Sequence, residues 1–158
     1  MSEKLPANAV LVESALRERG ANGEIVVLPE KAPTAAAAAA QLGCEVGAIA
    51  NSLIFDADGE PLLVPTSGAH RVDVELIART AGVQRVRRAT PEFVRAATGQ
   101  PIGGVAPVGH PAPVRTLVDN WLSKHDVVWA AGGHPSTVFP TTFDELVGIT
   151  GGTPVDVE

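Results

Sequence analysis

The segment from residue 48 to residue 69, AIANSLIFDADGEPLLVPTSGA, constrains the fold of this chain most strongly. Two apolar runs, at 49–55 and 62–65, flank the dipeptide Asp58-Gly59. Asp-Gly between two runs of this kind favours a tight turn that joins antiparallel strands. The segment therefore predicts a β-hairpin.

The first strand of this hairpin carries two adjacent polar residues, Asn51 and Ser52, at its centre. Each polar group that is buried without a hydrogen-bond partner costs about 1–3 kcal/mol. Successive side chains of a strand point to opposite faces of the sheet, so at least one of the two is expected to face a pocket. The alternative is structural: a buried Asn51 could tie its strand to a neighbouring loop.

The rest of the chain alternates helical and extended patterns. Asn8 and Thr34 are expected N-caps, and Gly20 and Gly43 follow the expected helix ends. We expect helices at 8–19, 35–42, 73–81, 91–97, 120–125 and 143–147, strands at 24–29, 83–86, 114–118, 127–131 and 136–139, and an edge strand at 153–157. This order predicts an α+β fold around a mixed sheet, with residues 1–158 forming one domain.

Composition excludes several classes of protein. The chain has 45% hydrophobic and 19% charged residues, which is typical of a folded domain. No run reaches the roughly 18 apolar residues of a membrane helix, and the polar start is unlike a signal peptide. The single Cys44 allows no internal disulfide, and it is expected to be a packed side chain rather than a nucleophile. These features indicate a cytoplasmic protein.

The charge is unevenly distributed. A net charge of −6 argues against a general nucleic-acid binder. Residues 71–95, however, contain six arginines and three acidic residues, a local charge of +3 that leaves −9 for the rest. Arg85, Arg87 and Arg88 are therefore candidate phosphate contacts for an RNA. The alternative is a solvated helix face and an exposed strand.

Metal and nucleotide motifs are missing from the sequence. His70, His110, His125 and His134 are scattered without the spacing of a metal site. The chain also lacks the GK[ST] ending of a P-loop, a GxGxxG motif and a GxSxG nucleophile elbow. We expect neither a metal nor an organic cofactor.

Two glycine-rich loops are the remaining candidates for chemistry. The first is GGVAPVGH at 103–110, and the second is AAGGH at 130–134, directly after an expected strand. Adjacent glycines leave backbone N–H groups free to approach a ligand, as in an oxyanion hole. Each loop ends in a histidine. Taken alone, each loop is more typical of a tight turn than of a site.

Together these features resemble the YbaK family, also called the prolyl-tRNA synthetase-associated domain. The resemblance is carried by Thr34 before the alanine-rich helix, by the hairpin segment, and by TPEFVRAATGQPIGGVAPVGH and VVWAAGGHPSTVF. It runs from about residue 8 to residue 155. It implies a mixed, barrel-like β-sheet surrounded by helices, and hydrolysis of the ester that joins a wrong amino acid to the 3′ end of a tRNA, commonly tRNA(Pro).

The resemblance also implies roles for residues of this chain. Catalysis in the family uses backbone N–H groups of the glycine loop, a positioned water and the terminal ribose hydroxyl of the substrate. The catalytic residues implied here are Gly103, Gly104 and Asn51, and the substrate-binding residues are Ser52, Ser67, Gly68, Pro107, Gly109, Gly132, Gly133 and His134.

The chain departs from the family pattern at Asn51. Relatives usually have a lysine in this position, followed by Ser, Thr or Asn, and that lysine is thought to contact the terminal nucleotide. Replacing one charge-assisted hydrogen bond by a neutral one costs roughly 1.5–3 kcal/mol. Two functions therefore stay open: a trans-acting aminoacyl-tRNA deacylase, and a non-catalytic relative that binds a tRNA end, a nucleotide or an amino-acid-like ligand.

Overall fold

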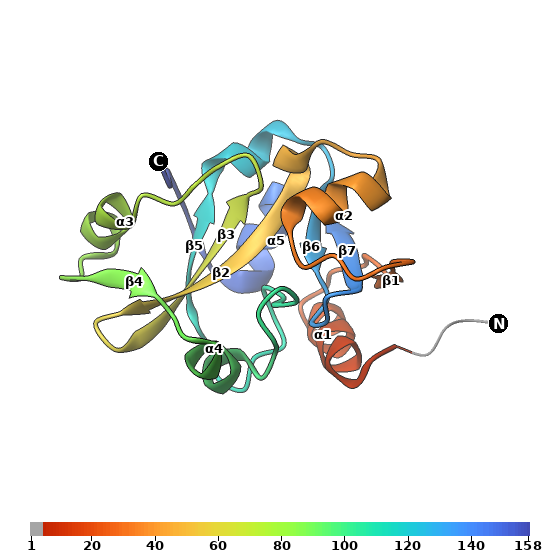
Figure 1. Ribbon diagram of the computed structural model, residues 1–158, viewed down its shortest axis with the longest axis horizontal. Coiled ribbons are helices and arrows are strands. Elements are labelled where there is room, and N and C mark those ends of the chain that lie inside the picture. Colours follow the sequence, from red (N-terminus) through yellow and green to blue (C-terminus); the bar gives the residue numbers. More distant parts are fainter. Residues whose placement is uncertain (1–4) are drawn as a thin grey trace.

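The computed structural model describes residues 5–158 and contains five α-helices around one mixed sheet (Figure 1). The helices are α1 (Ala7–Glu18), α2 (Ala35–Leu42), α3 (Val74–Ala81), α4 (Pro91–Thr98) and α5 (Phe143–Thr150), with 3-10 turns η1 (Val46–Ala48) and η2 (Asn120–Lys124). The strands are β1 (Val26–Val27), β2 (Ile49–Ala57), β3 (Glu60–Ser67), β4 (Val86–Arg88), β5 (Arg115–Asp119), β6 (Val128–Ala131), β7 (Thr137–Thr141) and β8 (Thr153–Val155). The α+β class is confirmed.

The predicted hairpin forms the centre of the sheet. Strands β2 and β3 pair antiparallel along their whole length, from Ala50 opposite Ser67 to Ala57 opposite Glu60. The turn residues Asp58 and Gly59 both have positive φ, of 52° and 91°, which is the backbone that an Asp-Gly turn favours. The sheet order is β1-β7-β6-β2-β3-β5-β8, with parallel pairs at β2–β6, β3–β5 and β5–β8.

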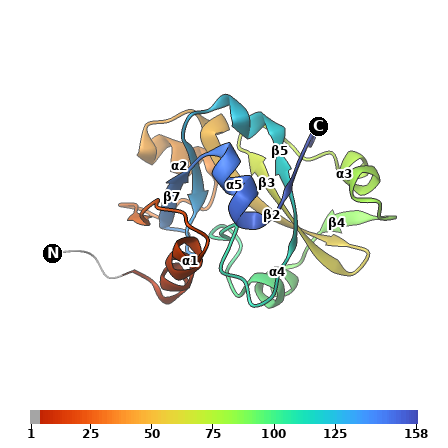
Figure 2. The ribbon, with the colours of Figure 1, turned by 180° about the vertical axis from the view of Figure 1, so that it is seen from behind.

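Helices cover both faces of the sheet (Figures 1 and 2). Helix α2 lies on the face seen in Figure 1, and α5 crosses the face seen in Figure 2. Helices α1 and α5 share one apolar cluster with β6 and β7, which includes the fully buried Val12, Phe139 and Leu146. Helix α3 packs near the hairpin turn, against Phe55 and Leu62.

The alanine-rich helix α2 forms as predicted. Thr34 Oγ1 accepts a hydrogen bond from Ala37 N at 3.2 Å, and Gly43 ends the helix with φ 69°. Its small side chains allow close approach to the sheet, and Ala38 and Ala39 pack near Ile49 and Val138. The helix therefore places the chain before it, at 32–34, beside the start of β2.

Several predicted boundaries were wrong. Helix α1 begins after Pro6, which fixes its own φ at −55°, so Asn8 lies inside the helix rather than at its cap. The strand expected at 83–86 is Val86–Arg88. The reason is local: Asp58 accepts hydrogen bonds from the N–H groups of Gln84 and Arg85, which are thus unavailable to a sheet.

The final helix extends to Thr150, beyond the expected end at 147, and the expected strand at 136–139 extends to Thr141. The edge strand in the tail is present as β8. Within residues 5–158, no helix is long and apolar enough to cross a bilayer.

Candidate active site

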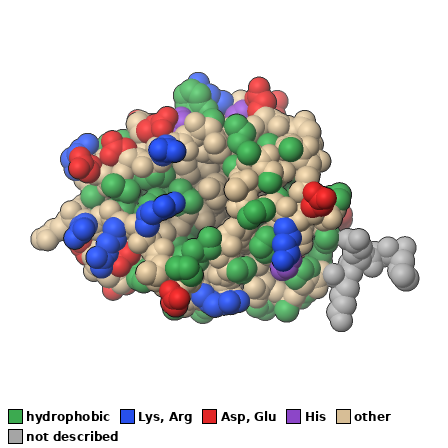
Figure 3. Space-filling model, in the orientation of Figure 1, with side chains coloured by type: hydrophobic (Ala, Val, Ile, Leu, Met, Phe, Trp, Pro, Cys, Tyr) green, Lys and Arg blue, Asp and Glu red, His purple; other side chains and the backbone are tan. Residues whose placement is uncertain are grey.

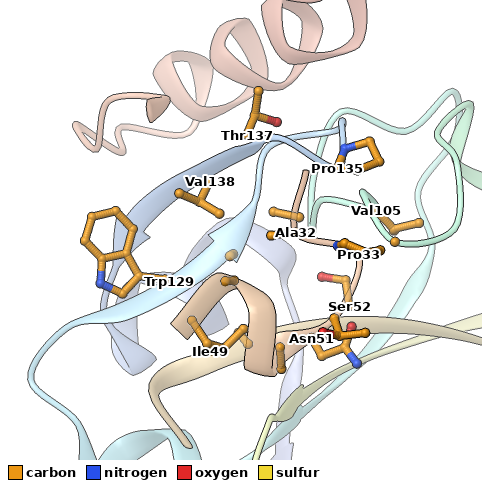
Figure 4. A pocket seen from close by; sticks show the side chains of 17 residues that line it. Ala32, Pro33, Ile49, Asn51, Ser52, Val105, Trp129, Pro135, Thr137 and Val138 are labelled. Atoms are coloured by element: carbon orange, nitrogen blue, oxygen red, sulfur yellow. The ribbon is translucent and has the colours of Figure 1, made fainter. Parts of the chain in front are cut away.

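A small cavity lies between α2, the start of β2 and the strands β6 and β7 (Figure 4). We call it the β2 cavity. Its volume is about 40 Å³, which exceeds the roughly 10–15 Å³ that one water molecule needs. Trp129 and Val138 lie on one side of it, and Asn51, Ser52 and Pro33 lie on the other (Figure 4).

The seventeen residues that line the β2 cavity include no ionisable side chain within the described chain. Four of them carry a hydroxyl or amide side chain, and two of these are engaged in hydrogen bonds. Thr34 caps α2, and Thr137 Oγ1 donates to His134 O at 3.0 Å. The other two, Asn51 and Ser52, make no side-chain hydrogen bond within residues 5–158.

Ser52 is nine-tenths buried, and its Oγ is the one buried side-chain polar atom without a partner in residues 5–158. A buried hydroxyl in this state costs free energy unless a ligand or a water completes its hydrogen bonding. Asn51 is exposed at the rim of the cavity. The alternative in which a buried Asn51 ties its strand to a loop is therefore wrong.

The first glycine loop contributes Gly103 and Val105 to the cavity wall. No hydrogen bond is found for the backbone N–H of either residue within the described chain, whereas the two N–H groups that alternate with them are paired. Gly104 N donates to Pro101 O at 3.0 Å, and Ala106 N donates to Gln100 Oε1 at 2.7 Å. The loop thus presents two free N–H groups on residues of the cavity wall.

Two side chains outside the cavity hold this loop. The buried Gln100 accepts from Ala106 N and donates from Nε2 to Val108 O at 3.3 Å. His110 Nε2 lies 2.8 Å from Ala106 O. Burial lowers the pKa of His110 below its ordinary value, and this favours the neutral ring that donates one N–H to that carbonyl. Neither Gln100 nor this role of His110 was predicted from the sequence.

The two glycine loops meet at Gly104. A Cβ added there would lie 2.6 Å from the backbone carbon of His134 and 2.7 Å from Pro135 N. Gly103, whose φ is +89°, lies against Pro33. Close approach of the loops therefore brings Pro135 into the cavity wall together with Gly103.

Of the second glycine loop, Ala130 and Ala131 line the cavity, whereas Gly132, Gly133 and His134 are not among its lining residues. Gly132 packs against Thr137, and Gly133 packs against Val12 and Asn8 of α1. His134 Nδ1 accepts from Ser136 N at 3.1 Å and lies 2.8 Å from Ser136 Oγ, so its ring serves its own turn. The substrate-binding roles expected of these three residues stay predictions.

Four further candidates lie away from the cavity wall. Pro107 is buried within the first loop, and Gly109 packs against Val12. Ser67 Oγ donates to Gly47 O at 2.8 Å, and Gly68 lies so close to Val46 O that a Cβ would not fit. Their expected roles in substrate binding likewise stay predictions.

The apolar wall was not predicted. The cavity is lined by Pro33, Trp129, Pro135 and Val138. In a sequence, an apolar residue that lines a cavity looks the same as one that packs in the core. Val105 could have been identified as a site residue from the sequence. It lies two residues after Gly103, in a glycine-rich loop whose backbone N–H groups are expected to be free.

Cysteine and metal chemistry receive no support from this arrangement. Cys44 is half-buried beside α2, and burial raises the pKa of its thiol, which disfavours a thiolate nucleophile. In residues 5–158, no group of three or more His, Cys, Asp or Glu side chains comes together in a way that could hold a metal ion.

Comparison with known proteins gives the family. Residues 29–149 match the model of the aminoacyl-tRNA editing domain. A proline–tRNA ligase of Nitratidesulfovibrio vulgaris is 33% identical over 93 residues, which are 59% of this chain and 16% of that ligase. The chain thus matches about one sixth of the length of this relative.

Two further relatives match over more of their length. An uncharacterized protein of Bacillus subtilis, YwhH, is 30% identical over 110 residues, which are 69% of each chain. The crystal structure of "a putative trans-editing enzyme for prolyl tRNA synthetase" is 40% identical, with a TM-score of 0.92 over 98% of this chain and 99% of that one. This chain belongs to the aminoacyl-tRNA editing domain family.

Proposed function

We propose that this protein is a trans-acting deacylase that hydrolyses the ester of a mischarged amino acid on a tRNA, with tRNA(Pro) as the first candidate. The observation that carries the proposal is the β2 cavity, where the free N–H groups of Gly103 and Val105 accompany the unpaired Oγ of Ser52. The family supports an aminoacyl-tRNA as the ligand. The proline–tRNA ligase and the trans-editing relative support tRNA(Pro).

The chemistry needs a stabilised oxyanion and an oriented water. Water attacks the ester carbonyl carbon, and the carbonyl oxygen gains the negative charge in the tetrahedral intermediate. The bond from that carbon to the ribose oxygen then breaks, and the proton of the water passes to the leaving ribose oxygen. The products are the free amino acid and the deacylated tRNA.

Residues of the cavity divide this work. The N–H groups of Gly103 and Val105 donate to the oxyanion, where one such donor is worth about 10²–10³ in rate. The Oγ of Ser52 orients the attacking water or the neighbouring ribose hydroxyl, which relays the proton. Gly104, expected at the carbonyl, instead sets the distance between the two loops, because its N–H is already paired with Pro101 O.

Asn51 takes the position at which relatives usually have a lysine. Its side chain lies at the rim and is free to donate from its amide to the terminal nucleotide. Residues 1–158 act as one editing domain where translation takes place, in the cytoplasm. Neither a metal nor an organic cofactor takes part in the proposed reaction.

The uncharged rim favours one second candidate, a relative that binds the tRNA end without turnover. The deciding experiment is hydrolysis of tRNA(Pro) charged separately with Ala, Ser, Thr, Cys, 2-aminobutyrate or Pro by the purified protein. Selective loss of one or more non-cognate esters, with Pro-tRNA(Pro) spared, supports the deacylase. If every ester decays only at its spontaneous rate while the tRNA still binds, the binding relative is correct.

A further inference from the structure

A groove outside the β2 cavity gathers most of the basic charge of the region at 71–95. It lies between α3 and β4, has a volume of about 660 Å³, and its basic residues are Arg79, Arg85, Arg87 and Arg88. We call it the basic groove. Glu75 is its one acidic lining residue, so the groove carries +3 in a chain of net charge −6. Figure 3 shows basic side chains on this face, including the part over α3 and β4.

The four arginines of the basic groove are available to a ligand. All four are exposed, and Arg87 alone has a carboxylate partner within residues 5–158, Asp56 Oδ2 at 3.4 Å. The floor between them is apolar, with Ala78 and Val86 buried. Exposed guanidinium groups above an apolar floor suit phosphate oxygens, which they bind in bidentate geometry.

The segment at 84–88, which carries three of these arginines, is held in place. Asp58, at the hairpin turn, accepts from Gln84 N at 2.9 Å and from Arg85 N at 3.0 Å. Arg87 then pairs with Asp56 of β2 in the sheet. The arginines therefore project from a backbone that the central hairpin fixes.

The basic groove and the β2 cavity share strand β2. Asn51 lies at the rim of the cavity, and Asp56, opposite Arg87, lies five positions further along the strand. At about 3.3 Å per residue, the separation along β2 is roughly 17 Å. One strand of a B-form duplex has one phosphate per about 3.4 Å of helix axis. On this scale, the separation corresponds to roughly five nucleotides.

We propose that the basic groove binds the phosphate backbone of the tRNA acceptor stem, several nucleotides inward from the esterified 3′ end. The inference rests on the proposed function for the position of that end, which lies in the β2 cavity. Contacts to phosphates carry no base information, so the groove supplies affinity and orientation while the cavity selects the ester. Arg79, on α3, joins the three arginines expected from the sequence.

The first test measures binding without chemistry. The dissociation constant of uncharged tRNA(Pro) is measured against salt concentration for the wild type and for the triple variant Arg79→Gln, Arg85→Gln, Arg88→Gln. Each lost phosphate contact lowers the slope of log K against log salt by about 0.9 in magnitude, so we expect a loss of roughly 2–3 together with weaker binding. Arg19→Gln, at the end of α1 on the opposite side of the molecule (Figure 1), is the matched control and keeps the wild-type slope. A triple variant with the wild-type affinity and slope overturns the proposal.

The second test separates the groove from the cavity. An aminoacylated CCA trinucleotide fills the cavity but is too short to reach the groove. We expect the triple variant to lose tenfold or more in kcat/KM on aminoacyl-tRNA, mainly through KM, and to match the wild type on the trinucleotide. An equal loss on both substrates overturns the proposal, because the variant then acts on the cavity. If the wild type hydrolyses neither substrate but the salt slope still depends on the three arginines, the deacylase proposal fails and the groove proposal stands.

Discussion

The two glycine loops look alike in the sequence and do different work in the structure. Each contains adjacent glycines and ends in a histidine. The first has free N–H groups on Gly103 and Val105, which lie in the wall of the β2 cavity. In the second, Gly133 packs against α1 and the ring of His134 contacts Ser136. Gly103 of the first loop lies in the cavity wall and Gly104 allows the two loops to approach, whereas Gly132 and Gly133 of the second pack against Thr137 and α1.

The comparison teaches that adjacent glycines identify close backbone approach without saying what approaches. In the first loop Gln100 and His110 bind Ala106 and so fix the loop from outside the cavity. In the second, Thr137 and Ser136 donate to His134, and the backbone N–H groups of Leu28 and Ala32 donate to Ser136 O and Pro135 O. The first loop is thus held by two nearby side chains, whereas the second is held by its own turn and by the backbone of the segment at 28–32.

The largest expected effect comes from Gly104, where the two loops touch. Gly104→Ala places a Cβ 2.6 Å from the backbone of His134, so the loops must separate and the N–H groups of Gly103 and Val105 must move. We expect deacylation to fall by about 10²–10³, the value of an oxyanion donor, with a lower melting temperature. Gly148→Ala is the control, because nothing lies within 4 Å of that Cβ on α5. Its activity should stay at the wild-type level, with stability raised by about 0.5–1 kcal/mol. Wild-type activity in Gly104→Ala would show that contact between the loops does not set the site.

Much of this fold follows from local sequence signals, while the cavity follows from contacts between distant segments. The hairpin, α2 and its Thr34 cap were predicted correctly because turn and capping chemistry act over a few residues. Asn51, Ser52 and Gly103 were predicted as site residues and do lie at the cavity. The apolar side chains Trp129 and Pro135 were missed, since they reach it only through the packing of β6 and β7 against α2.

Ser52 gives the next largest effect and separates function from stability. Ser52→Ala removes the unpaired buried hydroxyl, so stability should stay equal or rise, because a buried polar group without a partner is costly. We expect activity to fall about tenfold to a hundredfold if the hydroxyl orients water or ribose. Chemical denaturation and single-turnover deacylation measure the two quantities.

Ser67→Ala is the matched comparison for stability, because the Ser67 hydroxyl donates to Gly47 O. Its loss leaves a buried carbonyl unpaired, at a cost of about 1–3 kcal/mol. If Ser52→Ala instead destabilises the protein by a similar amount and keeps full activity, Ser52 is a structural residue.

Asn51 should give a smaller effect, of about tenfold, because it lies exposed at the rim. Asn51→Ala removes its amide donor and should raise KM for aminoacyl-tRNA. Asn51→Lys should be tolerated or improve KM, since an ammonium adds a charge-assisted bond to the terminal nucleotide. Steady-state kinetics on the ester that the wild type prefers measure both. Unchanged turnover and affinity in Asn51→Ala would remove this residue from the site.

The smallest effect concerns pH and the two loop histidines. Burial lowers the pKa of His110 from its ordinary value of 6.5, so the unfolded chain binds its proton at a higher pH than the folded one. The free energy of unfolding therefore falls as pH drops below about 6.5 towards the pKa of the folded state, and this contribution is fully present above 6.5. His110→Gln, which keeps a donor for Ala106 O, should show a smaller drop in the free energy of unfolding between pH 7.5 and 5.5 in urea titrations.

Because no ionisable side chain lines the β2 cavity in the described chain, single-turnover deacylation should show no histidine-type inflection between pH 6 and 8. An inflection that disappears in His134→Gln would show that the second loop takes part in catalysis, so that both loops would have a catalytic role.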